Sequence, residues 1–172
     1  GVSDKSIKEA LRKFQGVARR FEIYGDYPIG NGSAMLIEDY GHHHRELAAT
    51  IKGSMDGWPN RRLVMIFQPH RYSRTRDLFE DFVQVLSSCD ALLLLEVYSA
   101  GEDEIPGADS RTLCRSIRQR GLVDPIYVQN IQEVNEILRD VIQADDIIIT
   151  QGAGSVSKLV KILADSNLSQ DL

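Results

Sequence analysis

Short apolar segments alternate with amphipathic ones along most of this 172-residue chain. Runs rich in β-branched, leucine and aromatic residues predict strands, whereas apolar residues three or four positions apart predict helices. The predicted strands are residues 19–25, 34–40, 62–69, 91–98, 125–129 and 146–154. The predicted helices are residues 6–14, 45–54, 75–89, 110–121, 131–142 and 155–166.

Strands that alternate with helices form parallel crossover units, so we expect an α/β domain whose open sheet is covered by helices on both faces. The apolar runs 92–95 and 147–149 are typical of central strands buried on both sides. Residues 26–33 contain turn-forming types and predict a loop between the first two strands. Ser110 is expected to cap its helix and Gly121 to end it.

The composition is typical of one globular domain, with 42% hydrophobic and 26% charged residues. A net charge of −5 argues against nonspecific nucleic-acid binding, which needs an excess of Lys and Arg. The longest apolar run, 91–95, is too short to cross a membrane, and no secretory leader is expected. Cys89 and Cys114 have no metal-ligand spacing and are expected to be buried free thiols, which suits a reducing cytoplasm.

Four polar clusters each follow a predicted strand. In open α/β sheets, ligands bind beyond the carboxyl ends of the strands. The clusters are therefore expected to lie at one sheet edge and to form one candidate site. They are EDYGHH (38–43), QPHRYSRT (68–75), YSAGED (98–103) and TQGAG (150–154).

The second cluster holds His70, Arg71 and Arg74 in a strand-to-helix loop. If the helix has begun, the two arginines are three positions apart on one face. Two guanidinium groups suit a carboxylate or phosphate, which each can bind in bidentate fashion. The alternative is a solvated basic loop or a salt bridge to Asp77. The position at the sheet edge favours anion binding.

The stretch EDYGHHH contains three of the four histidines of the chain. His42, His43, His44 and Asp39 could be metal ligands, but consecutive residues point in different directions and no distant ligand completes a shell, so no metal site is predicted. The run is too short and too internal for an affinity tag. We favour hydrogen bonding of Asp39, Tyr40 and His42 to a ligand, with helix-start packing as the alternative for the first two histidines.

The remaining clusters carry weaker signals. TQGAGSVSK joins glycines to a helix N-terminus, which favours anions, but it matches neither G-x4-G-K-[ST] nor G-x-G-x-x-G. A plain tight turn explains it equally well. Glu102, Asp103, Glu104 and Asp109 could bind Mg²⁺, although an acidic surface loop is the favoured interpretation. No Ser-His-Asp or Cys-His constellation can be assembled, so no catalytic residue is assigned.

Taken in order, five segments resemble the carboxyl-terminal domain of the Mur ligase family, and within it the UDP-N-acetylmuramate–L-alanine ligases. The resemblance covers residues 14–155, and FQPHRYSRT favours this group over the ligases that recycle murein peptides. It implies a Rossmann-like, mostly parallel sheet for residues 16–172 and makes residues 1–15 a linker or the tail of a preceding central ATPase domain. The segments are FQGVARRFE, EDYGHHHREL, FQPHRYSRT, VYSAGEDEIPGADSRTLCRSIR and DIIITQGAGSV.

The resemblance also implies ligands, in a bacterial cytoplasmic enzyme of peptidoglycan synthesis. Such ligases use ATP and Mg²⁺ to form an acyl phosphate on UDP-N-acetylmuramate, which the amino group of L-alanine then attacks. By motif position, Arg20 would reach an ATP phosphate and Asp39 would bind the ATP ribose. The residues that match the L-alanine pocket are Tyr40, His42, His70, Arg71 and Arg74.

Two residues depart from the family pattern Asp-Asp-Tyr-Gly-His-His-Pro: Glu38 replaces the first acid and His44 the proline. The phosphate loop and the Mg²⁺ ligands of the central domain do not occur here, so these residues alone are expected neither to hydrolyse ATP nor to form the amide. Because the sequence starts at Gly1 without Met, we expect a piece of a longer ligase, with N-terminal and central domains as its partners. The alternative is a stand-alone ligand-binding or regulatory module of the same fold.

Overall fold

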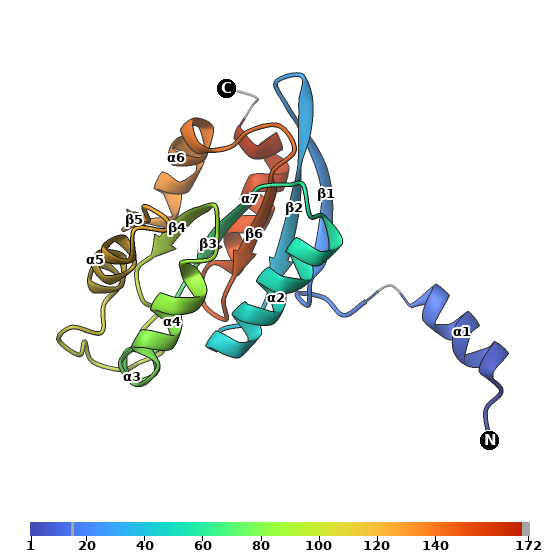
Figure 1. Cartoon of the computed structure of the whole chain (residues 1–172), viewed down its shortest axis with the longest axis horizontal. Coiled ribbons are helices and arrows are strands. Elements are labelled where there is room, and N and C mark those ends of the chain that lie inside the picture. Colours follow the sequence, from blue (N-terminus) through green and yellow to red (C-terminus); the bar gives the residue numbers. More distant parts are fainter. Residues whose placement is uncertain (15, 170–172) are drawn as a thin grey trace.

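The computed structural model describes residues 1–14 and 16–169, which contain one six-stranded sheet (Figure 1). The strand order is β1-β2-β6-β3-β4-β5. Neighbouring strands are parallel except β1 and β2, which form an antiparallel hairpin. The predicted α/β class with a mostly parallel sheet is thus confirmed. The strands are β1 Glu22–Ile29, β2 Gly32–Asp39, β3 Leu63–Phe67, β4 Ala91–Leu95, β5 Ile126–Val128 and β6 Ile147–Gln151.

Helices cover both faces of this sheet (Figure 1). One face packs on α2, α4 and α5, and the other packs on α6 and α7. In β6, Ile147 and Ile149 face the first layer and Ile148 faces the second, because side chains alternate along a strand. The helices are α1 Asp4–Lys13, α2 His44–Gly57, α3 Tyr72–Asp77, α4 Phe79–Leu86, α5 Ser110–Arg120, α6 Val134–Val141 and α7 Ser157–Asp165, with the 3₁₀ turns η1 Ile131–Glu133 and η2 Asn167–Ser169.

The first strand differs from the prediction. It begins at Glu22 and continues to Ile29, so most of the predicted turn 26–33 is strand, and the hairpin bends at Gly30, which has a φ of 54°. Pro28 cannot donate a backbone hydrogen bond, but β1 is an edge strand, where proline is tolerated. Proline and glycine therefore mark the edge of the sheet here and not a long loop.

Two helix predictions also need correction. The segment predicted as one helix over 75–89 begins earlier and is divided into α3 and α4 at Leu78, whose φ of −116° and ψ of 23° are not helical. Asp109, and not Ser110, caps α5: its carboxylate accepts a hydrogen bond from Thr112 N at 2.8 Å. Gly121 ends α5 in the left-handed conformation, as predicted.

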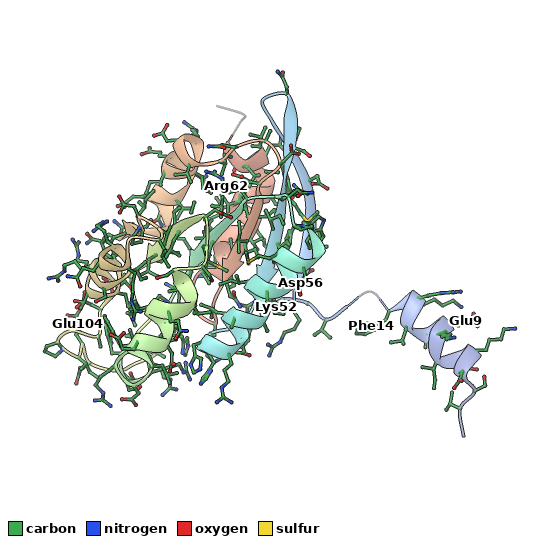
Figure 2. The ribbon with its side chains drawn as sticks, viewed as in Figure 1. Glu9, Phe14, Lys52, Asp56, Arg62 and Glu104 are labelled. Carbon is green, nitrogen blue, oxygen red and sulfur yellow. The ribbon has the colours of Figure 1, made fainter. Side chains whose placement is uncertain are left out.

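Helix α1 stands apart from the sheet, and none of its residues is buried (Figure 1). Its apolar residues Ile7 and Leu11 are exposed, as is the following Phe14, which Figure 2 labels on the same segment as Glu9. Cys89 and Cys114 are buried free thiols, as predicted. Among the described residues, no helix has the length and apolar character that crossing a membrane requires.

Candidate functional site

A cavity of about 540 Å³ opens at the carboxyl ends of the strands. It gathers residues from the loops after β2, β3 and β6, three of the four loops expected to form one site. All five residues matched to an L-alanine pocket line this cavity. Their proximity agrees with the prediction that the loops lie at one edge of the sheet. The lining residues are Tyr40, His42, His43, His70, Arg71, Ser73, Arg74, Asp77, Leu78 and Ala153.

Arg71 lies just before α3 with a φ of 76°, a conformation that is rare outside glycine. Its backbone N–H donates to Tyr98 O at 2.8 Å, which ties this strained residue to the loop after β4. Its side chain is 49% exposed, and Nη1 lies 3.5 Å from Glu102 Oε1. The helix therefore has not begun at Arg71, and the cavity position of its guanidinium depends on the loop.

Arg74 and His70 form the neighbouring part of the wall. Arg74 Nη1 donates to His70 O at 2.9 Å and lies 3.3 Å from His70 Nδ1. The His70 ring stacks on Tyr98 at a centroid distance of 5.4 Å and lies 5.5 Å from the His42 ring. Burial, and then the charges of His42, Arg74 and Arg71, lower the pKa of His70. A neutral imidazole thus faces the cavity at neutral pH.

Glu102 contributes to the site, although the sequence favoured a purely acidic surface loop. Its carboxylate accepts hydrogen bonds from Ser73 N at 2.9 Å and from Ser73 Oγ at 2.7 Å. These hydrogen bonds, followed by the charge of Arg71, lower the pKa of Glu102. Asp77 pairs with Arg76 at 2.8 Å. The alternative prediction, a salt bridge between Asp77 and one of the cavity arginines, is therefore wrong.

Of the three consecutive histidines, His43 caps α2 and His44 is the first residue of that helix. His43 Nδ1 accepts from Arg45 N at 3.3 Å, and Glu46 accepts from the backbone of His43 at 3.1 Å, which completes a capping box. His44 Nδ1 lies 3.6 Å from Asp81 Oδ2 on α4. Helix-start packing thus holds for His43. Within the part of the chain that the structure describes, no group of His, Cys, Asp or Glu is arranged to hold a metal ion.

Asp39, the residue matched to the ATP ribose, does not line the cavity. It is 8% exposed. Its Oδ1 accepts from Gly41 N at 2.7 Å and Gln151 Nε2 at 2.9 Å, and its Oδ2 accepts from Phe21 N at 2.9 Å. Because a carboxylate oxygen can accept two hydrogen bonds, Oδ2 retains capacity for one ribose hydroxyl.

Arg20, matched to an ATP phosphate, also lies outside the cavity. Its side chain is 52% exposed, with Nη1 3.3 Å from Glu46 Oε1 and its guanidinium 5.3 Å from the centre of the Tyr40 ring. An exposed arginine with one weak partner can turn to a phosphate. The nucleotide contacts of Arg20 and Asp39 thus stay predictions from the resemblance. The described residues offer no corresponding acidic set for Mg²⁺.

The glycines of TQGAG serve packing within the protein. A Cβ on Gly152 would lie 2.9 Å from Gln68 O, and one on Gly154 would lie 2.6 Å from Gln68 Oε1 and 2.7 Å from Tyr98 Cβ. Gln68 Oε1 also accepts from Val156 N at 2.9 Å, next to the start of α7. The close contacts at these two glycines are therefore made by Gln68 and Tyr98, which lie in the loops after β3 and β4.

Fold and cavity together define an α/β domain that presents two arginines and a neutral histidine at the carboxyl edge of its sheet. The chain belongs to the family described as Mur ligase, glutamate ligase domain, whose model matches residues 19–154. This match confirms at the family level the resemblance seen in the sequence.

Solved structures share the fold. UDP-N-acetylmuramate–alanine ligase from Thermotoga maritima matches with a TM-score of 0.73 at 23% identity, over 94% of this chain and 32% of that one. A murein peptide ligase from Psychrobacter arcticus matches with a TM-score of 0.66 at 19% identity, over 100% and 34%. Folylpolyglutamate synthase from Thermotoga maritima reaches 0.57 at 12% identity, over 98% and 36%. The chain spans about a third of each of these proteins.

Proposed function

We propose that this chain is the C-terminal domain of an ATP-dependent ligase that joins L-alanine to UDP-N-acetylmuramate through an acyl phosphate, in peptidoglycan synthesis in the bacterial cytoplasm. The observation that carries the proposal is the gathering of Tyr40, His42, His70, Arg71 and Arg74 around one cavity. The family match supports an amide-forming ligase, and the cavity chemistry supports a small substrate with a carboxylate.

The cavity chemistry fits a free amino acid. Arg71 and Arg74 supply guanidinium groups for its carboxylate, because each can bind a carboxylate in bidentate fashion. His70 has a lowered pKa and is neutral at pH 7, so it can accept a hydrogen bond from the amino group without repelling it. The substrate would thus be held by its carboxylate with the amine left free to attack an acyl group.

ATP and Mg²⁺ would be held mainly by the central domain of the same protein, with Arg20 and Asp39 reaching the nucleotide from this side. Residues 1–15 would be the tail of that domain or a linker, which agrees with an α1 that has no buried residue. Residues 1–172 alone would neither hydrolyse ATP nor form the amide, since they carry no phosphate-loop sequence.

The murein peptide ligase fold match makes a peptide-recycling ligase the competing assignment. The deciding assay measures phosphate release by the ligase that contains this domain, with ATP, Mg²⁺ and UDP-N-acetylmuramate plus either L-alanine or murein tripeptide. We expect release with L-alanine only. Release with the tripeptide only would assign the recycling reaction, and release by the isolated 172 residues would contradict their predicted inactivity.

A stand-alone binding or regulatory module would behave differently from a ligase domain. Isothermal titration of residues 1–172 with ATP and with L-alanine separates the two possibilities. A ligase domain should bind either ligand weakly, because the remaining contacts lie in other domains. Tight binding of one ligand by the chain alone would favour the module.

A further inference from the structure

The turn formed by residues 17–21 precedes β1 and contains two residues in the left-handed region. Arg19 has a φ of 60° and Phe21 a φ of 47°. Residues other than glycine keep such conformations only where their surroundings fix them. The turn is closed by a hydrogen bond from Arg20 N to Val17 O at 3.0 Å. Contacts with neighbouring residues must therefore hold this strained turn in place, and residues at the sheet edge provide these contacts.

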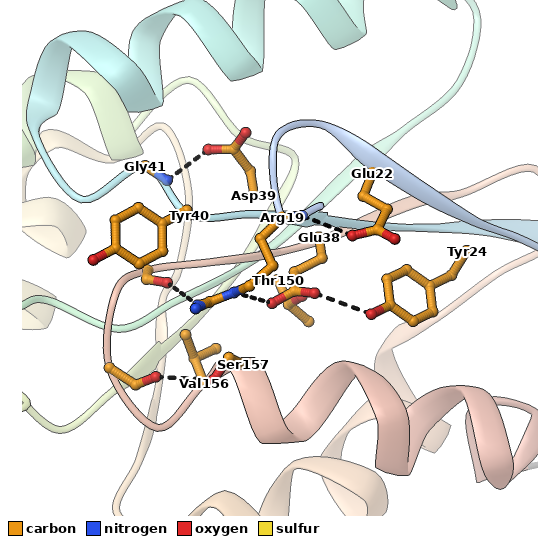
Figure 3. Close-up of polar contacts among 12 residues, drawn as sticks. Arg19, Glu22, Tyr24, Glu38, Asp39, Tyr40, Gly41, Thr150, Val156 and Ser157 are labelled. Atoms are coloured by element: carbon orange, nitrogen blue, oxygen red, sulfur yellow. Dashed lines mark hydrogen bonds and ion pairs between the residues drawn. The ribbon is translucent and has the colours of Figure 1, made fainter. Parts of the chain in front are cut away.

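Backbone and side-chain contacts fasten this turn to the end of β2 (Figure 3). Arg19 O accepts from Tyr40 N at 2.8 Å, and Phe21 N donates to Asp39 Oδ2 at 2.9 Å. Arg19 Nε donates to Glu38 Oε1 at 2.8 Å. The Glu38 side chain is 4% exposed and that of Arg19 is 34% exposed. A carboxylate this deeply buried is held by its charged partner, because an unpaired buried charge is strongly unfavourable.

The same arginine reaches the wall of the cavity. Arg19 Nη2 donates to Gly152 O at 3.3 Å, next to the cavity residue Ala153. The Arg19 guanidinium lies 4.8 Å from the centre of the Tyr40 ring, and Tyr40 is also a cavity residue. The Arg19 side chain thus contacts the ends of β2 and β6. The other oxygen of the Glu38 carboxylate, Oε2, accepts a hydrogen bond from Tyr24 OH at 3.1 Å (Figure 3).

We propose that Arg19 and Glu38 are positioning residues whose buried ion pair fastens the turn 17–21 to the sheet edge and thereby sets the places of Tyr40 and Ala153 in the cavity wall. The functional consequence rests on the proposed ligase activity. Glu38 does not line the cavity, so its effect on the substrate passes through Arg19 and the turn.

The chain contains a direct probe of this turn. Trp58 is its single tryptophan, and its ring stacks on Phe21 at a centroid distance of 6.2 Å and an interplanar angle of 12°. If Glu38→Gln loosens the turn, Phe21 should leave Trp58, whose emission should move to longer wavelength as water reaches the ring. The amides of Phe21 and Tyr40 should then exchange hydrogen faster.

The catalytic readout uses the ligase that contains this domain. Glu38→Gln should raise the KM for L-alanine by about tenfold, because a slightly displaced wall misplaces the substrate, and should leave the KM for the UDP-sugar unchanged. The double variant Arg19→Met, Glu38→Gln removes both charges and should stay folded while giving the same KM change. Asp56→Asn breaks the exposed Lys52–Asp56 pair on α2 (Figure 2) and should change neither measurement.

The possible outcomes are distinct. Unchanged emission and exchange in both variants would overturn the fastening. A loosened turn with an unchanged KM for L-alanine would overturn the positioning role. A ligase that accepts a different amino acid or peptide would refute the proposed function, whereas emission and exchange would still decide whether the ion pair holds the turn.

Discussion

The site contains two kinds of arginine. Arg19 pairs with the buried Glu38 at 2.8 Å, bridges to Gly152 O and lies over Tyr40. Arg71 is about half exposed, lies 3.5 Å from Glu102 and has its guanidinium in the open cavity. Both occupy positions with positive φ at the same sheet edge. They differ in how much of their hydrogen-bonding capacity the protein itself consumes.

This difference predicts a structural role for Arg19 and a binding role for Arg71. When a guanidinium pairs with a buried carboxylate, its removal destabilises the fold because the carboxylate is left without a charged partner. A guanidinium with one long contact keeps most of its five donors for a ligand. We therefore expect substitutions of Arg19 to act first on folding, and substitutions of Arg71 to act first on the substrate.

The largest effect is expected for Arg19→Ala in the 172-residue chain. Removal of the arginine leaves Glu38 buried with only Tyr24 as a side-chain partner, which should lower the free energy of unfolding by about 3 kcal/mol. Urea unfolding measures it, and Arg71→Ala is the matched control, with an expected change within about 0.5 kcal/mol. Equal losses in the two variants would erase the distinction between the arginines.

Arg71→Ala should instead act on the amino acid in the ligase that contains this domain. Loss of a charge-assisted hydrogen bond of about 1.5–3 kcal/mol corresponds to a rise of about 10- to 150-fold in the KM for L-alanine. The KM for the UDP-sugar should stay nearly constant. The control is Arg76→Ala on α3, the helix that follows Arg71, because Arg76 pairs with Asp77 and does not line the cavity. An unchanged alanine KM would show that Arg71 does not bind the substrate.

The effect of adding a methyl group should differ between Gly41, beside Asp39 in the site, and Gly53, on the open surface of α2. A Cβ on Gly41 would lie 2.5 Å from Gln151 Nε2 and 2.7 Å from Asp39 Oδ1, so Gly41→Ala should cost about 1–3 kcal/mol of stability. Gly53 lies in α2 with nothing within 4 Å of the added Cβ, and Gly53→Ala should stabilise by up to about 1 kcal/mol. Thermal unfolding of both variants measures the contrast. Similar melting temperatures would mean that the site tolerates side chains at Gly41.

The smallest effect concerns the charge state of the cavity. The pKa of His70 is lowered in the folded chain from its usual 6.5, so the unfolded state binds more protons between the lowered value and 6.5. Stability should then fall as pH decreases through this window and be fully present above it. His70→Asn should flatten this dependence in unfolding experiments between about pH 7.5 and pH 5. An unchanged pH profile would contradict the lowered pKa.

The sheet was predictable because its central strands carry strong local signals. Ile147, Ile148 and Ile149 form a continuous apolar run, and all are buried. The extended hairpin was not predictable locally, because Pro28 resembles a turn residue until its edge position is known. The division at Leu78 was hidden as well, since this residue continues the apolar stripe of the helix.

The candidate site divides in a similar manner. Tyr40, His42, His70, Arg71 and Arg74 could be grouped because the ends of parallel strands share an edge. The positive φ of Arg71 depends on a hydrogen bond to Tyr98 O, and Glu102 becomes relevant only through its contact with Ser73. Such contacts join loops far apart in the sequence and leave no local pattern. The fastening role of Arg19 belongs to the same class.

The position of β6 has a consequence for the order of folding. This late strand lies between β2 and β3, and the hydrogen bond from Gln151 to Asp39 spans 112 residues. Before β6 inserts, β2 and β3 have no direct pairing with each other. Closing so long a loop is entropically costly and makes folding slow. During synthesis, the β1–β2 hairpin and the β3–β4 pair would therefore stay unpaired with each other until β6 is made. The sheet edge that carries the cavity would form only when β6 joins them.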